Sequence, residues 1–528
     1  MTVGPAQPAL VEGKEGKQMK KSIRLWSALL GLLLTLSAAG CGAGQQESAG
    51  SSLSSGEAKS QTSEPADQSE GETIKITIMD YGDSYKPQRD AANEAYMKEH
   101  PNLEIEYTLT TRAQLTNTIL SAVSSGTAPD LFAIPDGITP AQAVSEGWYL
   151  PMSDYMENEQ EVWDSFVDGA ITEGKCMFDG KVYMVPESGG APHCMVLYNK
   201  DLFAAAGLDP EVPPKTYSEF REYARRITEA GNGQFYGIVE GATQSDRMAQ
   251  ILVCWSDLIG GSYRVDNNLN IRTGTPDWNN EAVYQVCELW KNLCEDESLH
   301  PNTATYIAPD ARAAFAGGQA GMIVQGWWNV GVWEAENPEL NYGVFAPPVP
   351  DGGSYTGCIP RMTGDPFLGV YSGTKHPQEA VDYLINVICG KDFQSAAVAA
   401  GVHDSLLRDV STEASVFEAS KEYFALGNEL GRVIPEFEVA NPDTAIVVSK
   451  FQEVHPNPTE IFSGILSGQV TDYKTALAQY TEAATEMWDK ALADANAEGH
   501  SFTTADFAFP DWDPTRNFTV EDYAALKK

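Results

Sequence analysis

The sequence predicts an α/β fold with more than one domain, and three observations lead to this class. The chain has 528 residues, which is more than a single hydrophobic core usually organises. Its hydrophobic content of 42% and aromatic content of 10% are ordinary for a soluble globular protein. From residue 73 onward, strand patterns alternate with helical patterns, which is typical of a βαβ architecture with a largely parallel sheet.

Three short strands open the folded part. Apolar and polar residues alternate over 74–78 and again over 103–107, and a third, more apolar strand covers 130–134. Helical patterns join them, the first reaching about residue 98 and the second about residue 125. This order predicts the first βαβ units of the fold.

The loops after the first and third strands are candidate binding loops, because ligands of open α/β sheets lie beyond the carboxyl ends of the strands. Tyr81 and Asp83 follow the first strand, and Asp136 follows the third. We expect these three residues to contact a ligand. The alternative is that they serve only turn formation.

The middle of the chain repeats the pattern. Strands are predicted at 182–185, 195–198 and 322–324, and a helix is predicted from Tyr217 to Ala230. Thr216 is its expected N-cap, because a threonine side chain can accept a hydrogen bond from the first turn of a helix.

The last third of the chain is mainly helical in pattern from about residue 442 to 495. The final stretch, 502–528, is rich in aromatic residues and interrupted by prolines. We expect it to pack as an extended tail.

A secretory signal occupies residues 20–40, with a basic start, about a dozen apolar residues and then small residues. The apolar run is too short for a stable transmembrane helix. Cys41 follows the small residues, which resembles the bacterial lipobox, whose cysteine is lipidated; an ordinary signal peptide with a chance cysteine is the alternative. Met19 is a possible true start. Residues 42–72 are polar and small, and predict a flexible tether.

The net charge of −39 would repel nucleic acid and anionic lipid, so neither is an expected partner. The sequence shows no phosphate-binding loop, no nucleophile elbow and no zinc-protease motif, and its seven histidines are scattered. We therefore expect no enzyme activity, no cofactor and no metal. The seven cysteines after Cys41 form no C-x-x-C pair, so free thiols are expected for most of them.

Five short blocks occur in an order that resembles family 1 extracellular solute-binding proteins, the lipoprotein receptors of bacterial ABC importers. Each block alone is weak, but their order over about 73–495 is specific. The blocks are SGTAPD (125–130), GKVYMVP (180–186), LYNKDLF with AGL (197–208), PPKTY (213–217) and FAGGQAGM followed by GWW (315–328).

The resemblance implies a two-lobed periplasmic-binding-protein-like fold of type II, with a ligand cleft between lobes that crossover segments join. It also implies a monomer without catalysis that captures a small carbohydrate, delivers it to permease subunits and touches the membrane only through its lipid anchor. The expected divisions are a signal at 1–40, a tether at 41–72, a first lobe at 73–187 and 370–425, a second lobe at 188–369 and 426–495, and an extension at 496–528.

Trp328 is the strongest candidate for a sugar platform, because the tryptophan two residues after the block's glycine stacks on sugar in many members of the resembled family. An aromatic face suits the C–H surface of a pyranose. In an extended segment Trp327 and Trp328 would face opposite ways, so we expect Trp328 in the cleft and Trp327 inward. Trp333 is expected to pack on a following helix.

Four further residues are candidate ligand contacts, each with a structural alternative. Glu187 and His193 lie in the expected crossover and could exchange hydrogen bonds with hydroxyl groups. Trp255 could equally fill the core. Arg361 could instead form an ion pair with Asp365 that orders a loop.

Rival functions stay open at this point. The leading one is capture of an oligosaccharide for ABC import. The others are capture of a polyamine or a peptide, a secreted carbohydrate-active enzyme, and a sensor subunit for a membrane kinase. The identity, length and linkage of the sugar do not follow from the sequence.

Overall fold

In the computed structural model, the described residues are 73–526 apart from 83, 262–263, 266–268 and 362–363, and all belong to one unit spanning 70–528. The predictions for the signal, Cys41, the tether and Asp83 therefore lie outside the described residues. Among the described helices, none is both long and apolar enough to cross a membrane.

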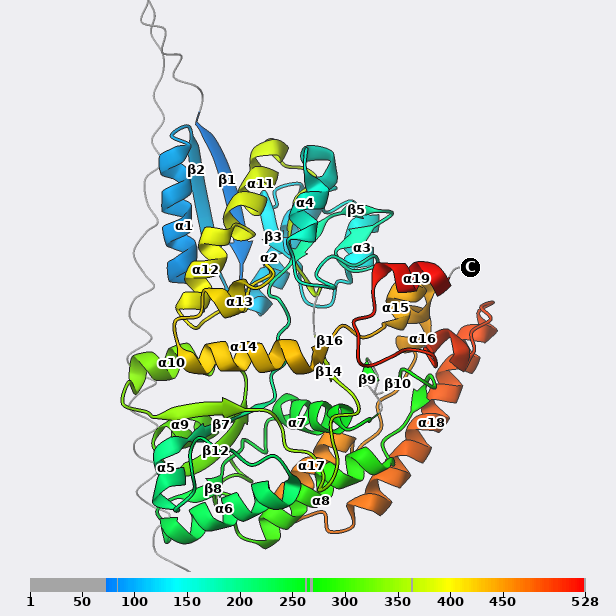
Figure 1. The fold of residues 1–528 in the computed structure, drawn as a ribbon. Coiled ribbons are helices and arrows are strands. Elements are labelled where there is room, and N and C mark those ends of the chain that lie inside the picture. The colour runs from blue at the N-terminus through cyan, green and yellow to red at the C-terminus, as the bar shows by residue number, and fades with distance from the viewer. Residues whose placement is uncertain (1–72, 83, 262–263, 266–268, 362–363, 527–528) are drawn as a thin grey trace, which may run out of the picture. The chain divides into compact units, whose positions relative to one another are not determined.

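The first sheet has five strands in the order β2-β1-β3-β15-β6. Figure 1 labels β1, β2 and β3 of this sheet. Strands β1, β2 and β3 are mutually parallel, and β15 runs antiparallel to both β3 and β6. The largely parallel sheet predicted from the pattern is thus confirmed here, with one reversed strand. The bounds are β1 Ile74–Asp80, β2 Leu103–Leu109, β3 Leu131–Ala133, β6 Met184–Pro186 and β15 Pro366–Val370.

Two of the helices on this sheet begin at a threonine cap, Thr111 and Thr139. The Thr111 side chain accepts from the Gln114 N–H, and Gly126 ends the same helix with a φ of 72°. We call the sheet with these helices the first lobe. The helices are α1 Lys86–Glu99, α2 Arg112–Ser125, α3 Pro140–Ser145, η1 Met152–Tyr155, α4 Glu159–Asp164, α11 Pro377–Tyr383, η3 Leu384–Ile388 and α12 Lys391–Ala399.

The single strand predicted at 182–185 is two strands. β5 (Lys181–Val182) forms a hairpin with β4 (Met177–Phe178), whereas β6 pairs with β15 in the main sheet. Tyr183 separates them because the chain changes its pairing partner there.

The second sheet has four strands in the order β13-β7-β12-β8, with β12 parallel to β8 and antiparallel to β7. Their bounds are β7 Met195–Asn199, β8 Tyr236–Ile238, β12 Ala320–Gln325 and β13 Tyr342–Phe345. Thr216 caps the predicted helix through the Glu219 N–H, as expected. The helices of this second lobe are α5 Lys200–Ala205, α6 Tyr217–Gly231, α7 Ser245–Leu258, α8 Glu281–Glu295, α9 Ala308–Ala316, α10 Asn329–Glu336, α14 Glu418–Leu430, α17 Pro458–Leu466 and α18 Tyr473–Ala497.

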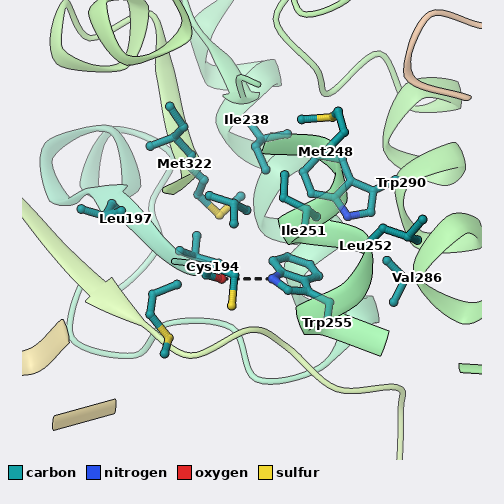
Figure 2. Packing of buried hydrophobic residues seen from close by; sticks show 14 of the residues in the cluster. Cys194, Leu197, Ile238, Met248, Ile251, Leu252, Trp255, Val286, Trp290 and Met322 are labelled. Atoms are coloured by element: carbon teal, nitrogen blue, oxygen red, sulfur yellow. Dashed lines mark hydrogen bonds between the residues drawn. The ribbon is translucent and has the colours of Figure 1, made fainter. Parts of the chain in front are cut away.

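The two sheets have separate hydrophobic cores. The second-lobe core gathers Leu197, Ile238 and Met322 from the sheet against Trp255 and Trp290 from the helices (Figure 2). Separate cores are what a two-lobed chain requires.

The C-terminal segment packs against α18 around a third core. Phe507 is fully buried and Trp512 is 4% exposed, so the aromatic tail predicted to pack does so. The remaining short elements are β9 Arg264–Val265, β10 Leu269–Asn270, β11 Thr275–Pro276, β14 Ile359–Pro360, α13 Val410–Glu413, β16 Gly431–Arg432, α15 Phe437–Ala440, η4 Pro442–Thr444, α16 Ala445–Val448, η5 Thr504–Phe507 and α19 Val520–Leu526.

Two expected lobe boundaries do not fit the strands and helices. The boundary at 369/370 would divide β15, yet the whole strand pairs within the first sheet. The boundary at 425/426 would divide α14, whose Tyr423 and Phe424 lie in the second-lobe core. β15 pairs within the first sheet and α14 is one continuous helix. The segments that cross between the lobes therefore lie outside these two elements.

Candidate functional site

The carboxyl ends of β1, β3 and β6 meet at one edge of the first sheet, together with the start of the antiparallel β15. The predicted residues Tyr81, Asp136 and Glu187 follow these three strands and line one pocket of about 320 Å³. The other residues that line this pocket, which we call the first-lobe pocket, include Arg112, Asp365 and Phe367.

Arg112 organises one wall of the first-lobe pocket. Its guanidinium carbon lies 4.0 Å from the centre of the Tyr81 ring, and its Nη1 lies 3.4 Å from Asp136 Oδ1. The Tyr81 ring meets Phe367 edge-on at 5.2 Å. Burial, helped by the charge of Glu187, raises the pKa of Tyr81 to about 12, so its hydroxyl keeps its proton and can donate to a ligand.

Glu187 is held by a buried chain of polar groups. The Tyr85 hydroxyl donates to Glu187 Oε1 at 3.2 Å, and the Arg89 guanidinium lies 5.5 Å from the Tyr85 ring centre. Arg89, 1% exposed, donates to fully buried Asp80 at 3.1 Å. Burial raises the pKa of Glu187, and the Tyr85 hydrogen bond opposes this. The carboxyl group is therefore positioned before any ligand arrives.

Trp327 and Trp328 lie in a turn and not in an extended segment, which corrects the geometry predicted for them. β12 ends at Gln325, and the Asn329 side chain donates to the Gly326 carbonyl at 2.9 Å as α10 begins. The Trp328 ring folds back over Gly326, where a Cβ would lie 2.1 Å from it. The two indoles meet edge-on at 5.7 Å.

The relative burial of the tryptophans follows the prediction even though the turn differs. Trp327 is 9% exposed within the second-lobe core, whereas Trp328 is only partly buried against it. Trp333 is 3% exposed on α10 and packs on Phe315 at 4.9 Å, which confirms its packing role. Trp328 thus keeps accessible surface for a ligand.

His193 lies beside Trp328, their rings meeting edge-on at 4.8 Å. Burial, and next the charge of Arg247, lower the pKa of His193 to about 4, so the ring is neutral near pH 7. A neutral imidazole can accept one hydrogen bond and donate another. The predicted pair of crossover residues is split, with Glu187 on the first-lobe pocket and His193 beside Trp328.

Trp255 is in the core and not at a ligand surface. It is 1% exposed, its indole N–H donates to the Cys194 carbonyl at 3.1 Å, and it packs on Trp290 (Figure 2). Its burial favours the packing role that the sequence left open.

The Arg361 side chain contacts the segment that links the two sheets. Its Nη2 lies 3.5 Å from the Gly189 carbonyl and its Nη1 lies 3.4 Å from Asn428. The ion pair expected with Asp365 is wrong, because Asp365 lies 3.5 Å from Lys175 instead.

The comparisons with known proteins agree with this geometry. The family model for the bacterial extracellular solute-binding protein matches residues 82–387. This match covers more than half of the chain. The chain belongs to the bacterial extracellular solute-binding protein family.

Relatives and solved structures are consistent with that membership. The solute-binding protein is 24% identical over 276 residues to a putative binding protein of Brucella abortus, covering 52% of this chain and 63% of the relative. It is 23% identical over 327 residues to an uncharacterized ABC transporter extracellular-binding protein of Pyrococcus horikoshii. This match covers 61% of this chain and 67% of the relative. The matched region thus spans less than two thirds of the Brucella relative.

Solved structures establish the fold class. The cyclic alpha-maltosyl-1,6-maltose binding protein from Arthrobacter globiformis gives a TM-score of 0.57 at 19% identity, covering 79% of this chain and 99% of that one. The maltose/maltodextrin-binding domain from Bdellovibrio bacteriovorus gives a TM-score of 0.53 at 20% identity, and the match covers 80% of this chain and 99% of that one. The predicted two-lobed type II fold is confirmed. The family is one of binding proteins and not of enzymes.

Sequence reasoning missed several polar residues of the solute-binding protein. Arg112 is one, and the others lie at the carboxyl edge of the second sheet: Glu240 after β8, Arg247 in α7 and Gln325 at the end of β12. Each is a polar residue within or beside an apolar segment. That signal is weak by itself, because many such residues are simply solvated.

Glu240 gives the solute-binding protein a predictable pH dependence. Its side chain is fully buried, and burial raises its pKa from 4.5 to about 8, opposed by Arg247 and by the hydrogen bond from Val324 N–H. Between about pH 4.5 and 8 the unfolded chain loses this proton while the folded chain keeps it, so stability falls with rising pH. We expect Glu240→Gln to remove the part of the pH dependence of stability that comes from this carboxyl group.

Urea denaturation of both proteins at pH 5, 6, 7 and 8 measures the effect. The wild type should lose more free energy of unfolding across this range than the variant. Parallel pH profiles for the two proteins would contradict the raised pKa of Glu240.

Proposed function

We propose that this protein captures an oligosaccharide outside the cell and delivers it to an ABC importer. The observation that carries the proposal is the placement of an aromatic ring with polar neighbours at the carboxyl edge of each sheet. Tyr81 lies with Glu187 in the first-lobe pocket, and Trp328 lies beside His193. Sugars need this combination, since their C–H faces stack on rings and their hydroxyls need hydrogen-bond partners.

The short segment 187–194 links these two edges. It leaves β6 at Glu187 and enters β7 after Cys194. Within it, the Ala191 N–H donates to the buried Asp404 side chain at 2.7 Å. A Cβ at Gly189 would lie 2.2 Å from the Ser405 carbonyl oxygen. The segment connects the two edges directly, so a change of its backbone angles would bring both edges onto a ligand.

The names of similar proteins support a sugar as the ligand and an ABC importer as the partner. Those in solved structures include a maltodextrin-binding domain bound to maltotriose and a protein in complex with raffinose. The Pyrococcus relative is named as part of an ABC transporter. Lipidation at Cys41 with a tether at 42–72 would hold this receptor, as a monomer, at the outer face of the membrane.

Thermal-shift screening of the full chain tests the proposal. Neutral and acidic oligosaccharides, polyamines and short peptides would be added separately at the same concentration. A ligand at a hundredfold excess over its Kd should stabilise the folded state by about 2.7 kcal/mol. We expect this stabilisation from an oligosaccharide. A shift with a polyamine or a peptide and with no sugar would reject the proposed substrate class, and sugar turnover by the pure protein would reject a receptor.

A further inference from the structure

Two arginines near the carboxyl edge of the second sheet form no ion pair with an acidic side chain among the described residues. Arg247, in the first turn of α7, is 2% exposed and donates through Nη2 to the His193 carbonyl at 2.8 Å, while its Nε and Nη1 have no partner. Arg312 on α9 is half-buried, and within the described part of the chain it has no hydrogen bond or ion pair. Burial, and next the charge of Arg247, lower the pKa of Arg312, so the two cations are neighbours.

This arrangement is unusual for this chain. Acidic residues outnumber basic ones by 74 to 35, so carboxylates are not scarce. Among the described residues, the other deeply buried arginine is Arg89, which has Asp80 at 3.1 Å. A buried guanidinium without a counter-charge is costly to fold. Two such neighbours therefore indicate that a partner arrives from outside the chain.

Among the described residues, the carboxyl group of Glu240 lies near Arg247, but no ion pair joins the two side chains. Glu240 keeps its proton near pH 7 because burial raises its pKa to about 8, and its Oε2 has no partner. Gln325, also fully buried, has neither amide atom paired. The Glu240 carboxyl group and the Gln325 amide therefore have hydrogen-bonding atoms that a polar ligand could use.

The cluster adjoins the proposed sugar platform. Arg247 holds the backbone carbonyl of His193, and the His193 ring contacts Trp328. A sugar ring stacked on Trp328 would therefore carry its substituents close to Arg247. Since Arg312 is the more exposed of the two arginines, an incoming anionic group would meet it first.

We propose that Arg247 and Arg312 form an oxyanion subsite that selects acidic oligosaccharides, those bearing a carboxylate or a sulfate or phosphate ester. The inference rests on the proposed function and narrows its substrate class. The planar guanidinium fork matches oxyanions in a bidentate manner. In a protein with a net charge of −39, such a subsite is also needed to overcome the long-range repulsion of an acidic ligand.

Calorimetric titration of the full chain tests the subsite with three probes: a trigalacturonate, its carboxyl-reduced trisaccharide and maltotriose. We expect the acidic probe to bind at least tenfold more tightly than the reduced one. Arg247→Gln and Arg312→Gln should each weaken the acidic probe at least tenfold, and Arg312→Gln should change the reduced probe less than twofold. The matched control is Arg226→Gln, since Arg226 donates to the backbone carbonyls of Ala206 and Gly207 in the same lobe.

The outcomes separate the subsite from the proposed function. Equal affinities for every acidic trisaccharide, the sulfated and phosphorylated ones included, and its neutral counterpart would overturn the subsite while leaving sugar capture intact. Wild-type affinity for the acidic probes in both variants would do the same. No binding of any sugar would overturn both. A sulfated or phosphorylated trisaccharide that binds in an Arg312-dependent way, where the trigalacturonate does not, supports the subsite with an ester as its anion. If Arg247→Gln fails to fold, the half-buried Arg312→Gln decides alone.

Discussion

Trp328→Ala is expected to weaken oligosaccharide binding by about 2 kcal/mol, or roughly thirtyfold in Kd. Of the three tryptophans at 327, 328 and 333, Trp328 keeps the most accessible surface, and it lies in a turn beside the half-buried His193. Stability should change little by comparison, because only part of the ring is packed. Calorimetric titration gives the Kd, and a thermal melt gives the stability.

The conservative variant Trp328→Phe separates stacking from packing. It keeps an aromatic face, so it should recover most of the affinity lost in Trp328→Ala. An alanine variant that binds sugar normally would remove Trp328 from the site. A variant that unfolds would assign the ring to the core.

Trp255→Ala is expected to destabilise the fold by about 3–5 kcal/mol, because removing a buried aromatic ring leaves a cavity. The loss also leaves the Cys194 carbonyl without the indole N–H that it now accepts from. Urea denaturation at pH 7 measures the change in the free energy of unfolding.

Trp163→Ala is the matched control for this loss. Trp163 lies on α4 and is only partly buried, so a smaller destabilisation is expected from the same change. A Trp255→Ala variant that loses less than 1 kcal/mol, or no more than the Trp163 variant, would contradict the core assignment.

The periodicity of the chain was enough to predict the first three strands, the helix after Thr216 and strand β12. These are segments whose apolar residues all face one core, so local pattern and tertiary packing agree. Pattern failed at 182–185 because two sheets compete for consecutive residues. It also failed at the lobe boundaries, since crossings are set by which sheet a strand joins and not by local composition.

The first-lobe part of the site was predictable because strand ends are visible in the sequence. Tyr81, Asp136 and Glu187 each follow a strand. Parallel pairing of β1 with β3 brings the first two to one edge, and β6 carries Glu187 to the same edge through the antiparallel β15. Trp255 was not separable from a ligand contact, because burial of an indole depends on packing across the sheet. Arg247 and Arg312 were missed for the same reason, since the lack of an acidic partner exists only in three dimensions.

Tryptophan-fluorescence titration of the full chain with oligosaccharides, run in parallel on Trp328→Ala, is the most direct test of oligosaccharide capture. The wild type should give a saturable signal with at least one oligosaccharide, and the variant should need roughly thirtyfold more ligand for half-saturation. Saturation of both proteins at the same ligand concentration, or no response to any oligosaccharide, would contradict a sugar receptor built around Trp328.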